Sequence, residues 1–350
     1  MGEQEGSAAG PALTEYAELH GCSCKVGQGD LEALLADAGL ETEPQRDTPD
    51  RGDALLGIGD DAAARRLRED LALVSTVDFF TPVVDDPYDF GRIAACNAAS
   101  DAFATGATDE LSCLVVLGLP REVTDCAADI VAGMADALAA VDGEIVGGHT
   151  VLNPWPLAGG AVTATAHPDD VRSSAGAAPG DVLYLTKPLG TQPAAGALRT
   201  ADGEFAETVA EAASRPVETI GAEAVDWMTT PNRDAARALR EHASALTDVT
   251  GFGLRGQSRT LAARSAVGVE LTRLPVIDGT PALSRLFGYG LERGESAETS
   301  GGLLAAVPPD SAADAEAALA DADVFFRQVG RVTDGEDVEL VDPTVEPVQR

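Results

Sequence analysis

Strand-like and helix-like apolar patterns alternate along most of this chain, and the alternation limits the folds open to it. In the first half, strands are expected at residues 71–77, 110–119 and 157–166, where apolar runs are short and rich in aliphatic residues. Residues 87–104 predict a helix, because apolar side chains recur there with helical spacing. The pattern predicts an α/β (α+β) protein in which helices pack on sheets.

The rest of the chain mixes strands and helices in a similar way. Further strands are expected at residues 144–146, 181–186, 267–272, 303–307 and 324–332. Further helices are expected at residues 125–141, 194–243 (with breaks at Pro216 and Pro231), 254–266 and 311–320. A chain of 350 residues exceeds the roughly 250 to 300 residues at which single cores stop growing, so two domains are expected.

Composition marks the expected domain boundaries. Residues 1–53 lack sustained periodicity, apart from a short helix expected at 31–38 after Asp30, and they end in a polar linker at 41–53. The composition changes again at 167–180, which we interpret as the junction between domains. The expected units are a flexible arm and linker (1–53), a first domain (54–168) and a second domain (169–350).

The net charge of −34 excludes some partners. Acidic residues number 58 against 24 Lys and Arg, so the surface repels nucleic acid, anionic lipid and any triphosphate without a bound cation. This acid-rich, lysine-poor composition is typical of a high-salt cytosol, as in a halophilic archaeon. The first ten residues lack the features of a secretory signal, and no apolar run reaches the roughly 18 residues of a membrane span. We expect a cytoplasmic protein with no nucleic-acid or membrane partner.

The segment Gly21-Cys22-Ser23-Cys24-Lys25 places two thiols beside a rare ammonium group. The chain has only two lysines, Lys25 and Lys187. A neighbouring ammonium lowers the pKa of a thiol and favours the nucleophilic thiolate. We expect a mobile arm that could close over a site, and a metal-binding or incidental Cys-x-Cys is the alternative. The other cysteines lie in apolar segments and are expected to be buried: Cys96, Cys113 and Cys126.

Four aspartates stand at the ends of apolar runs or on apolar faces: Asp61, Asp78, Asp101 and Asp248. Asp60 precedes Asp61, and the alanines that follow give these adjacent carboxylates no bulky cover. Asp101 shares the buried stripe of its expected helix with Asn97. Partly buried carboxylates need a partner, and Mg²⁺ prefers oxygen ligands and bridges to phosphate. Helix capping or turn formation is the alternative for any single aspartate.

Two glycine-rich pieces are candidates for phosphate binding. Gly147-Gly148-His149-Thr150 follows an expected strand, and Thr250-Gly251-Phe252-Gly253 precedes an expected helix, where free N–H groups favour an anion. Neither has the Gly-Lys-Ser/Thr of a P-loop, and an ordinary turn is the alternative for each. His149 is expected to be a hydrogen-bonded turn residue, because no second catalytic group is identifiable near it.

Together these pieces resemble the selenophosphate synthetase (selenide, water dikinase) family of the aminoimidazole ribonucleotide synthetase-like ATP-binding superfamily. The most specific match is the run from Thr76 to Asp101. The matching segments follow the same order from residue 21 to about 307, so the resemblance covers most of the chain. They are residues 21–25, 60–63, 75–82, 89–101, 147–150, 185–190, 247–254 and 299–304.

The resemblance implies a two-domain fold with mixed sheets flanked by helices and a flexible N-terminal arm. It also implies a homodimer whose N-terminal domains share an ATP site. The family reaction converts ATP, selenide and water into selenophosphate, AMP and phosphate. By position, Cys22 matches the reactive cysteine and Lys25 the essential lysine. The magnesium ligands match Asp61, Asp101 and Asp248. The nucleotide-binding positions match Lys25, Ile58, Gly59, Asp60, Asp78, Asp101, Gly148, His149 and Thr150. K⁺ is a further cation that the resemblance leaves open.

Some positions depart from the family pattern. Ser23 stands where many relatives have glycine, Ser296-Ala297-Glu298 replaces Asp-Pro-Gln, and Gln257 replaces a histidine. Another superfamily member with a different acceptor, such as thiamine monophosphate or a carbamoyl group, would explain the aspartates but not the cysteine segment. A non-catalytic selenium or metal carrier would use Cys22 and Cys24 and need no ATP. The sequence leaves open the role of Cys24, the selenium donor and the downstream use of selenophosphate.

Overall fold

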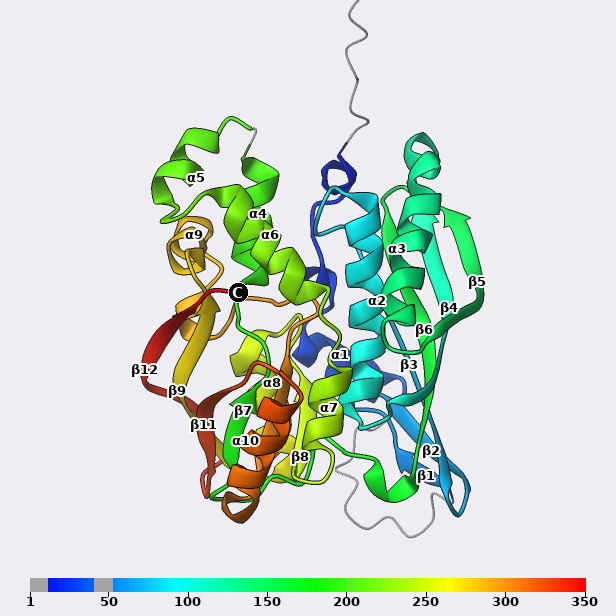
Figure 1. Cartoon of the computed structure of the whole chain (residues 1–350), viewed down its shortest axis with the longest axis vertical. Coiled ribbons are helices and arrows are strands. Elements are labelled where there is room, and N and C mark those ends of the chain that lie inside the picture. The colour runs from blue at the N-terminus through cyan, green and yellow to red at the C-terminus, as the bar shows by residue number, and fades with distance from the viewer. Residues whose placement is uncertain (1–11, 41–52, 202) are drawn as a thin grey trace, which may run out of the picture.

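The computed structural model describes residues 12–40, 53–201 and 203–350. Figure 1 shows two sheets that stand side by side, with helices between them and along them. Each sheet has six strands. This arrangement agrees with the expected α/β (α+β) class. We call the part of the chain that forms the first sheet the first half, and the part that forms the second sheet the second half. The site described below lies where elements of the two halves meet.

The first sheet has the strand order β1-β2-β3-β6-β4-β5. β4 and β5 are parallel and the other neighbours are antiparallel, so the sheet is mixed, as expected. Its strands are β1 (Ala54–Leu56), β2 (Ala63–Arg68), β3 (Leu71–Phe80), β4 (Asp109–Leu119), β5 (Glu144–Leu152) and β6 (Leu157–Ala166). Helices α2 (Pro87–Ala104) and α3 (Ala127–Ala139) pack together against this sheet.

The second sheet has the strand order β12-β9-β11-β7-β10-β8, in which β12 and β9 alone among the assigned neighbours are parallel. Its strands are β7 (Val182–Leu185), β8 (Ala245–Asp248), β9 (Gly268–Ile277), β10 (Leu303–Val307), β11 (Arg327–Thr333) and β12 (Val338–Val348). The helices of this half are α4 (Thr191–Thr200), α5 (Ala206–Ala212), α6 (Val217–Met228), α7 (Arg233–Leu239), α8 (Gly253–Ser265), α9 (Thr280–Phe287) and α10 (Ala312–Asp321).

Helix α2 connects the two halves, and its local sequence explains its position. The Asp86 side chain accepts the N–H of Asp89 at 2.9 Å, and proline follows at the first helical position, so the helix begins at Pro87. Phe90 packs edge-to-face on Phe80 of β3 with ring centroids 5.9 Å apart, a contact worth about 0.5–1.5 kcal/mol beyond burial. α2 also contacts α6, α7 and β8, so its polar residues reach the junction of the two halves.

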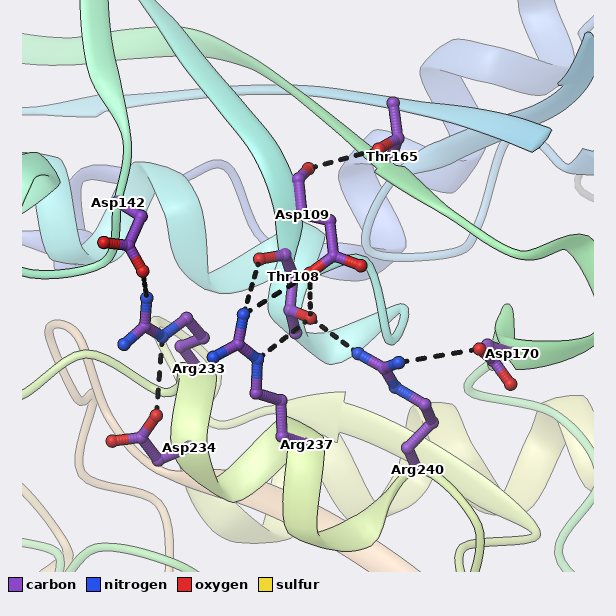
Figure 2. Close-up of polar contacts among 9 residues, drawn as sticks. All are labelled: Thr108, Asp109, Asp142, Thr165, Asp170, Arg233, Asp234, Arg237 and Arg240. Carbon is purple, nitrogen blue, oxygen red and sulfur yellow. Dashed lines mark hydrogen bonds and ion pairs between the residues drawn. The ribbon is translucent and has the colours of Figure 1, made fainter.

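A row of arginines in and just after α7 joins the second half to the first (Figure 2). Arg233 and Arg237 pair with aspartates of the first half, and Arg240 pairs with Asp170 in the segment between the two sheets. The pairs are Arg233–Asp142 at 2.8 Å, Arg237–Asp109 at 3.3 Å and Arg240–Asp170 at 3.5 Å. Arg240 also donates to the hydroxyl of Thr108 at 2.6 Å. We call these contacts the arginine seam.

Several elements differ from the expectations of the sequence. β5 continues to Leu152, so residues 147–150 lie in an exposed edge strand and not in a turn, and His149 is a strand residue. The sequence did not predict this part of the strand, because two consecutive glycines usually weaken a strand pattern. In the structure, Gly147 and Gly148 both have a φ of 155°. The first residues of the helix expected at 125–141 belong to a 3-10 helix, Arg121–Cys126. β9 extends five residues beyond its expected end at 272, to Ile277.

Five helices and strands were not expected. β1 has three residues, β8 has four, β2 is mostly exposed, β12 contains two prolines, and α9 is short, so none gives a long apolar pattern. The N-terminal helix α1 (Gln28–Asp37) begins before the expected range of 31–38. Residues 41–52 of the expected linker, together with 1–11 of the arm, lie outside the described residues.

Within the residues that the structure places, we find no helix long and apolar enough to cross a membrane.

Candidate active site

Three of the predicted aspartates meet between the two halves. Asp61 lies just before β2, Asp101 lies in α2, and Asp248 ends β8. One carboxylate oxygen of each lies within 4.8 Å of the corresponding oxygens of the other two. The contact between α2 and β8 brings Asp101 and Asp248 together from opposite halves of the chain. We call these three residues the aspartate cluster.

Hydroxyl groups are the main partners of the cluster. Asp61 Oδ1 accepts from Thr247 at 2.9 Å, Asp101 Oδ2 from Thr76 at 2.7 Å, and Asp248 Oδ2 from Ser100 at 2.6 Å. Asp61 Oδ2 is buried and has no hydrogen-bond partner. A buried carboxylate oxygen without a partner is costly, which makes this oxygen available to a cation.

Electrostatics at the cluster also favour a bound cation. Burial first, and then the negative charge of its neighbours, raises the pKa of Asp61 and of Asp101 well above the usual range. Burial likewise raises the pKa of Asp248, although Lys25 opposes the shift. The donor set consists of carboxylate and hydroxyl oxygens, which suits Mg²⁺. The residues present therefore fit the predicted metal.

Lys25 brings a positive charge close to the cluster. Its Nζ donates to Asp78 Oδ2 at 2.8 Å, and Asn97 Nδ2 donates to the same oxygen at 2.7 Å. Burial opposes the charge on Lys25, but the negative charge of Asp78 and of the nearby carboxylates Asp101 and Asp248 helps to raise the pKa of its ammonium well above its usual value. Lys25 is therefore a stable cation beside the carboxylates.

The cysteine segment is docked in the structure. Gly21 N–H donates to the carbonyl of Thr81 at 3.0 Å, and Cys22 N–H donates to the hydroxyl of Thr299 at 3.1 Å. Gly21 has a φ of 58°, and a Cβ there would collide with Thr299. A Cβ on Gly251 would lie 2.5 Å from the carbonyl oxygen of Cys22. Glycines on both sides of the segment therefore allow it to lie close to the second half.

The thiol of Cys22 is enclosed in this docked arrangement. Its side chain is fully buried, and Sγ donates to Asn97 Oδ1 at 3.3 Å. The adjacent lysine does lower the pKa of this thiol, as the sequence suggested, but burial has the larger effect and raises it. Cys22 is therefore a protonated thiol here, and forming the thiolate requires a change in its surroundings.

Asp60 and the predicted nucleotide-binding residues occupy different environments. The carboxylate of Asp60 is fully enclosed and accepts from Arg264 at 2.6 Å and from Ser173 and Ser174 at 2.9 Å. Its side chain therefore links the two halves. Ile58 and Gly59 beside it are exposed.

The predicted residues Gly148, His149 and Thr150 lie apart from the aspartate cluster within one chain. They belong to β5, at one edge of the first sheet, whereas residues 58–60 follow β1 at the opposite edge. Four strands separate the two edges. All three residues are exposed. Within a single chain, therefore, residues 58–60 and residues 148–150, both predicted to bind the nucleotide, do not lie together.

Several polar residues that support the site were not assigned a role from the sequence. Asn97 contacts Cys22, Asp78 and the backbone N–H of Ser300, the last at 2.9 Å. Asn97 lies four residues before Asp101 in the same helix, so the sequence indicated that both side chains share one face of that helix. Lys187 is buried and donates to the carbonyl of Ser300 at 2.8 Å, and burial lowers its pKa to about 8. The rarity of lysine could have singled it out.

Two of the departures from the family pattern have structural roles. Gln257 Nε2 donates to the hydroxyl of Thr247, which in turn donates to Asp61. Glu298 is buried and accepts the N–H groups of Gly190 and Thr191 at the start of α4, at 2.9 and 2.8 Å. Both residues stabilise segments that carry site residues.

Comparisons with known proteins show the family of the chain. The chain matches the family descriptions "AIR synthase related protein, N-terminal domain" over residues 59–166 and "AIR synthase related protein, C-terminal domain" over residues 178–343. It is 41% identical to the selenide, water dikinase of Methanococcus maripaludis over 323 residues, which cover 90% of this chain and 93% of the relative. It is 42% identical to that of Methanocaldococcus jannaschii over 329 residues, covering 91% and 92%.

A solved structure shares the fold. "AaThiL complexed with AMPPCP and TMP" aligns with a TM-score of 0.69 and 21% identity, covering 92% of this chain and 95% of that chain. At this identity the likeness shows a common fold alone. The sequence relatives are much closer and extend over almost their whole length. The chain therefore belongs to the selenide, water dikinase family of AIR synthase-related enzymes.

Proposed function

We propose that this chain synthesises selenophosphate from ATP, selenide and water, with release of AMP and phosphate. The observation that carries the proposal is the docked cysteine segment. Cys22 and Lys25, far from the aspartates in sequence, lie beside Asn97 and Asp78 and next to the aspartate cluster. A phosphate acceptor other than selenide would give no reason for a thiol at this place.

Mg²⁺ is the proposed cation of the cluster, with Asp61, Asp101 and Asp248 as its protein ligands. When bound, it would neutralise carboxylate and phosphate charge and so allow ATP into a protein with a net charge of −34. The unpaired oxygen of Asp61 and the raised pKa values of the cluster support this assignment. K⁺ remains an open second cation.

Lys25, Asp78, Asn97 and Cys22 are the other residues with proposed roles in the reaction. Lys25 stays protonated because its pKa is raised, so its ammonium can neutralise charge on the transferred phosphoryl group. Asp78 positions Lys25, Asn97 positions Cys22, and the hydrogen bond between Asn97 and Asp78 links the two contacts. Cys22 is the proposed residue that receives or positions selenium, after its thiol loses the proton that burial now retains. Mobility of the arm, which stays a prediction, would provide that change.

A homodimer would complete the nucleotide site. Residues 148–150 lie across the sheet from residues 58–60, so a second copy is needed to bring the two predicted pieces together. Exposed apolar side chains support such a contact. Val77 and Leu114 are both paired with Ala161 on neighbouring strands, so they lie on the same face of the first sheet, the face turned away from α2, where a second copy could cover them. Sedimentation equilibrium should give a mass near twice 35.8 kDa, and a monomer would contradict the proposal.

The composition supports a cytoplasmic enzyme that works at high salt, because counterions would screen its many surface carboxylates. Activity measured across KCl concentrations should therefore rise toward molar salt. An enzyme that is most active in dilute buffer would count against this adaptation.

Phosphorus NMR of ATP, selenide and Mg²⁺ incubated with the protein tests the proposed reaction. Selenophosphate and AMP should appear together with the native chain. Cys22→Ser should abolish selenophosphate formation, whereas Cys126→Ser, at the end of a 3-10 helix in the first half, should preserve it. Full selenide-dependent AMP formation by Cys22→Ser would overturn the role given to Cys22.

A further inference from the structure

A small cavity lies against the cysteine segment, apart from the aspartate cluster. Its volume is about 180 Å³, and its lining includes His20, Ser23, Val83 and Thr299. Ser23 follows Cys22 directly, and Thr299 accepts the N–H of Cys22. The cavity therefore touches the docked segment on both sides of the reactive cysteine position.

The cavity contains a cation that has no acidic partner. Arg199, in the last turn of α4, donates to the carbonyl of Val83 at 3.5 Å and to the hydroxyl of Tyr289. Within the described residues, no carboxylate lies within ion-pair distance of Arg199, whereas Arg264 pairs with Asp60. A half-buried arginine in a cavity without a carboxylate partner favours an anionic ligand.

Other charges near the cavity leave this preference intact. Glu18 is the one carboxylate among the lining residues, and it is exposed. Asp85 is near enough to influence Arg199, but its Oδ1 already accepts the N–H and hydroxyl of Thr14, at 2.9 and 2.7 Å. Burial lowers the pKa of His20, so this ring is neutral at neutral pH, and it contacts the carbonyl of Thr14 at 3.0 Å. Arg199 is then the dominant charge inside the cavity.

The size of the cavity limits the ligand to a small molecule. Pockets for drug-sized ligands typically have volumes of about 300–1,000 Å³. The present volume is below that range, which favours a ligand much smaller than a nucleotide. Lys25, four residues beyond Gly21, reaches Asp78 beside the aspartate cluster, so the cysteine segment extends from the cavity to the predicted nucleotide site.

We propose that this cavity binds the selenium substrate as the hydrogen selenide monoanion, with Arg199 as its counter-charge. The proposal rests on the proposed function and deepens it. Selenide is a monoanion at neutral pH. Because Cys22 is buried and does not line the cavity, selenide would reach its thiol only after the movement of the arm proposed above. The phosphate and the selenium would then approach the segment from separate sides, which would keep two anions apart until they react.

Direct binding of selenide tests the proposal without reference to catalysis. Anaerobic equilibrium dialysis of the full chain against selenide, with bound selenium measured by mass spectrometry, should give a saturable site. Arg199→Gln should weaken this binding by at least about tenfold, as expected for the loss of a charge-assisted hydrogen bond. Arg199→Lys should recover part of it. Arg259→Gln, which changes an exposed arginine of α8, should bind like the native chain.

A second variant fills the cavity and keeps its charge. Ala297 lines the cavity, so Ala297→Leu should weaken selenide binding while Arg199 remains. Steady-state kinetics should show a higher KM for selenide in both variants and a KM for ATP that stays within about twofold of the native value. Thermal unfolding of each variant checks that the fold is retained.

The outcomes separate this proposal from the proposed function. Native selenide binding by Arg199→Gln and Ala297→Leu would overturn the cavity assignment, even if the native chain makes selenophosphate. An equal rise in the KM for ATP would also overturn it, because Arg199 would then only hold the arm. Selenide binding that depends on Arg199, without any selenophosphate from the native chain, would refute the proposed function and leave the cavity assignment standing.

Discussion

The aspartate cluster and the arginine seam both lie between the two halves of the chain, but their charges are balanced in opposite ways. Each seam arginine has an aspartate partner within 3.5 Å (Figure 2). The cluster has hydroxyl partners, one unpaired carboxylate oxygen and raised pKa values. The seam is electrostatically complete, whereas the cluster would be completed by the cation proposed for it. Function is therefore expected where charge is left unbalanced.

Asp60 and Asp61 show the same contrast one residue apart. Asp60 is fully enclosed by Arg264 and two serines, and it holds the halves together. Asp61 turns to the cluster and keeps one oxygen unpaired. Adjacent residues of the same type therefore lie in different environments, one fully paired and one with an unpaired carboxylate oxygen.

The largest expected effect is the loss of nucleotide binding in Asp101→Asn. Removing one carboxylate from the cluster should weaken binding of ATP in the presence of Mg²⁺ by more than about 100-fold, because the cation loses a charged ligand. Isothermal titration calorimetry measures the affinity. Asp109→Asn in the seam is the matched control and should bind ATP normally. Unchanged affinity in Asp101→Asn would refute the metal assignment.

Asp60→Asn should mainly reduce stability. The substitution leaves Arg264 buried without its charged partner, which typically costs about 3 kcal/mol or more of unfolding free energy. Denaturant unfolding followed by circular dichroism measures the change. A loss as small as that of Asp109→Asn would mean that Asp60 does not join the halves.

Mg²⁺ should stabilise the native chain through the cluster. At a concentration of 100 times Kd, binding adds about 2.7 kcal/mol to the free energy of unfolding. The thermal midpoint should therefore rise with Mg²⁺ in the native chain and stay constant in Asp61→Asn. A similar rise in both proteins would place the bound cation elsewhere.

Substitutions in the seam should have the smallest effect. Arg237→Gln removes an ion pair whose side chains are 43% and 56% exposed, so the unfolding free energy should fall by less than about 1 kcal/mol. The difference from the native chain should vanish in about 1 M KCl, where the screening length is about 3 Å. A large loss that persists at high salt would show that the seam is more than a surface contact.

Local patterns were sufficient for the elements with strong signals. Residues 87–104, 157–166 and 303–307 have the expected bounds in the structure, as α2, β6 and β10. Proline at the start of α2 and unbroken apolar character in β10 explain this success. β5 was cut short in the prediction because consecutive glycines resemble a turn, and pairing with β4 is what makes them a strand.

The candidate site was partly predictable for the same reason. Buried carboxylates are rare enough that Asp61, Asp101 and Asp248 could be selected from their apolar surroundings. The burial of Asp60 depends on its ion pair with Arg264, which is 204 residues away in the chain. The enclosure of Cys22 depends on Asn97, which is 75 residues away. No local pattern encodes such partners.

Residue type and spacing were thus enough to indicate the fold class, the aspartates and the importance of the Cys22–Lys25 segment. Contacts between distant segments determined which carboxylate oxygen has no partner, that burial raises the pKa of the docked thiol, and that residues 148–150 lie across the sheet from residues 58–60. Arg199 became noticeable in the same way, as a cation without an acid in a cavity. The physical reason is that burial and charge pairing depend on neighbours in space, and folding chooses those neighbours from the whole chain.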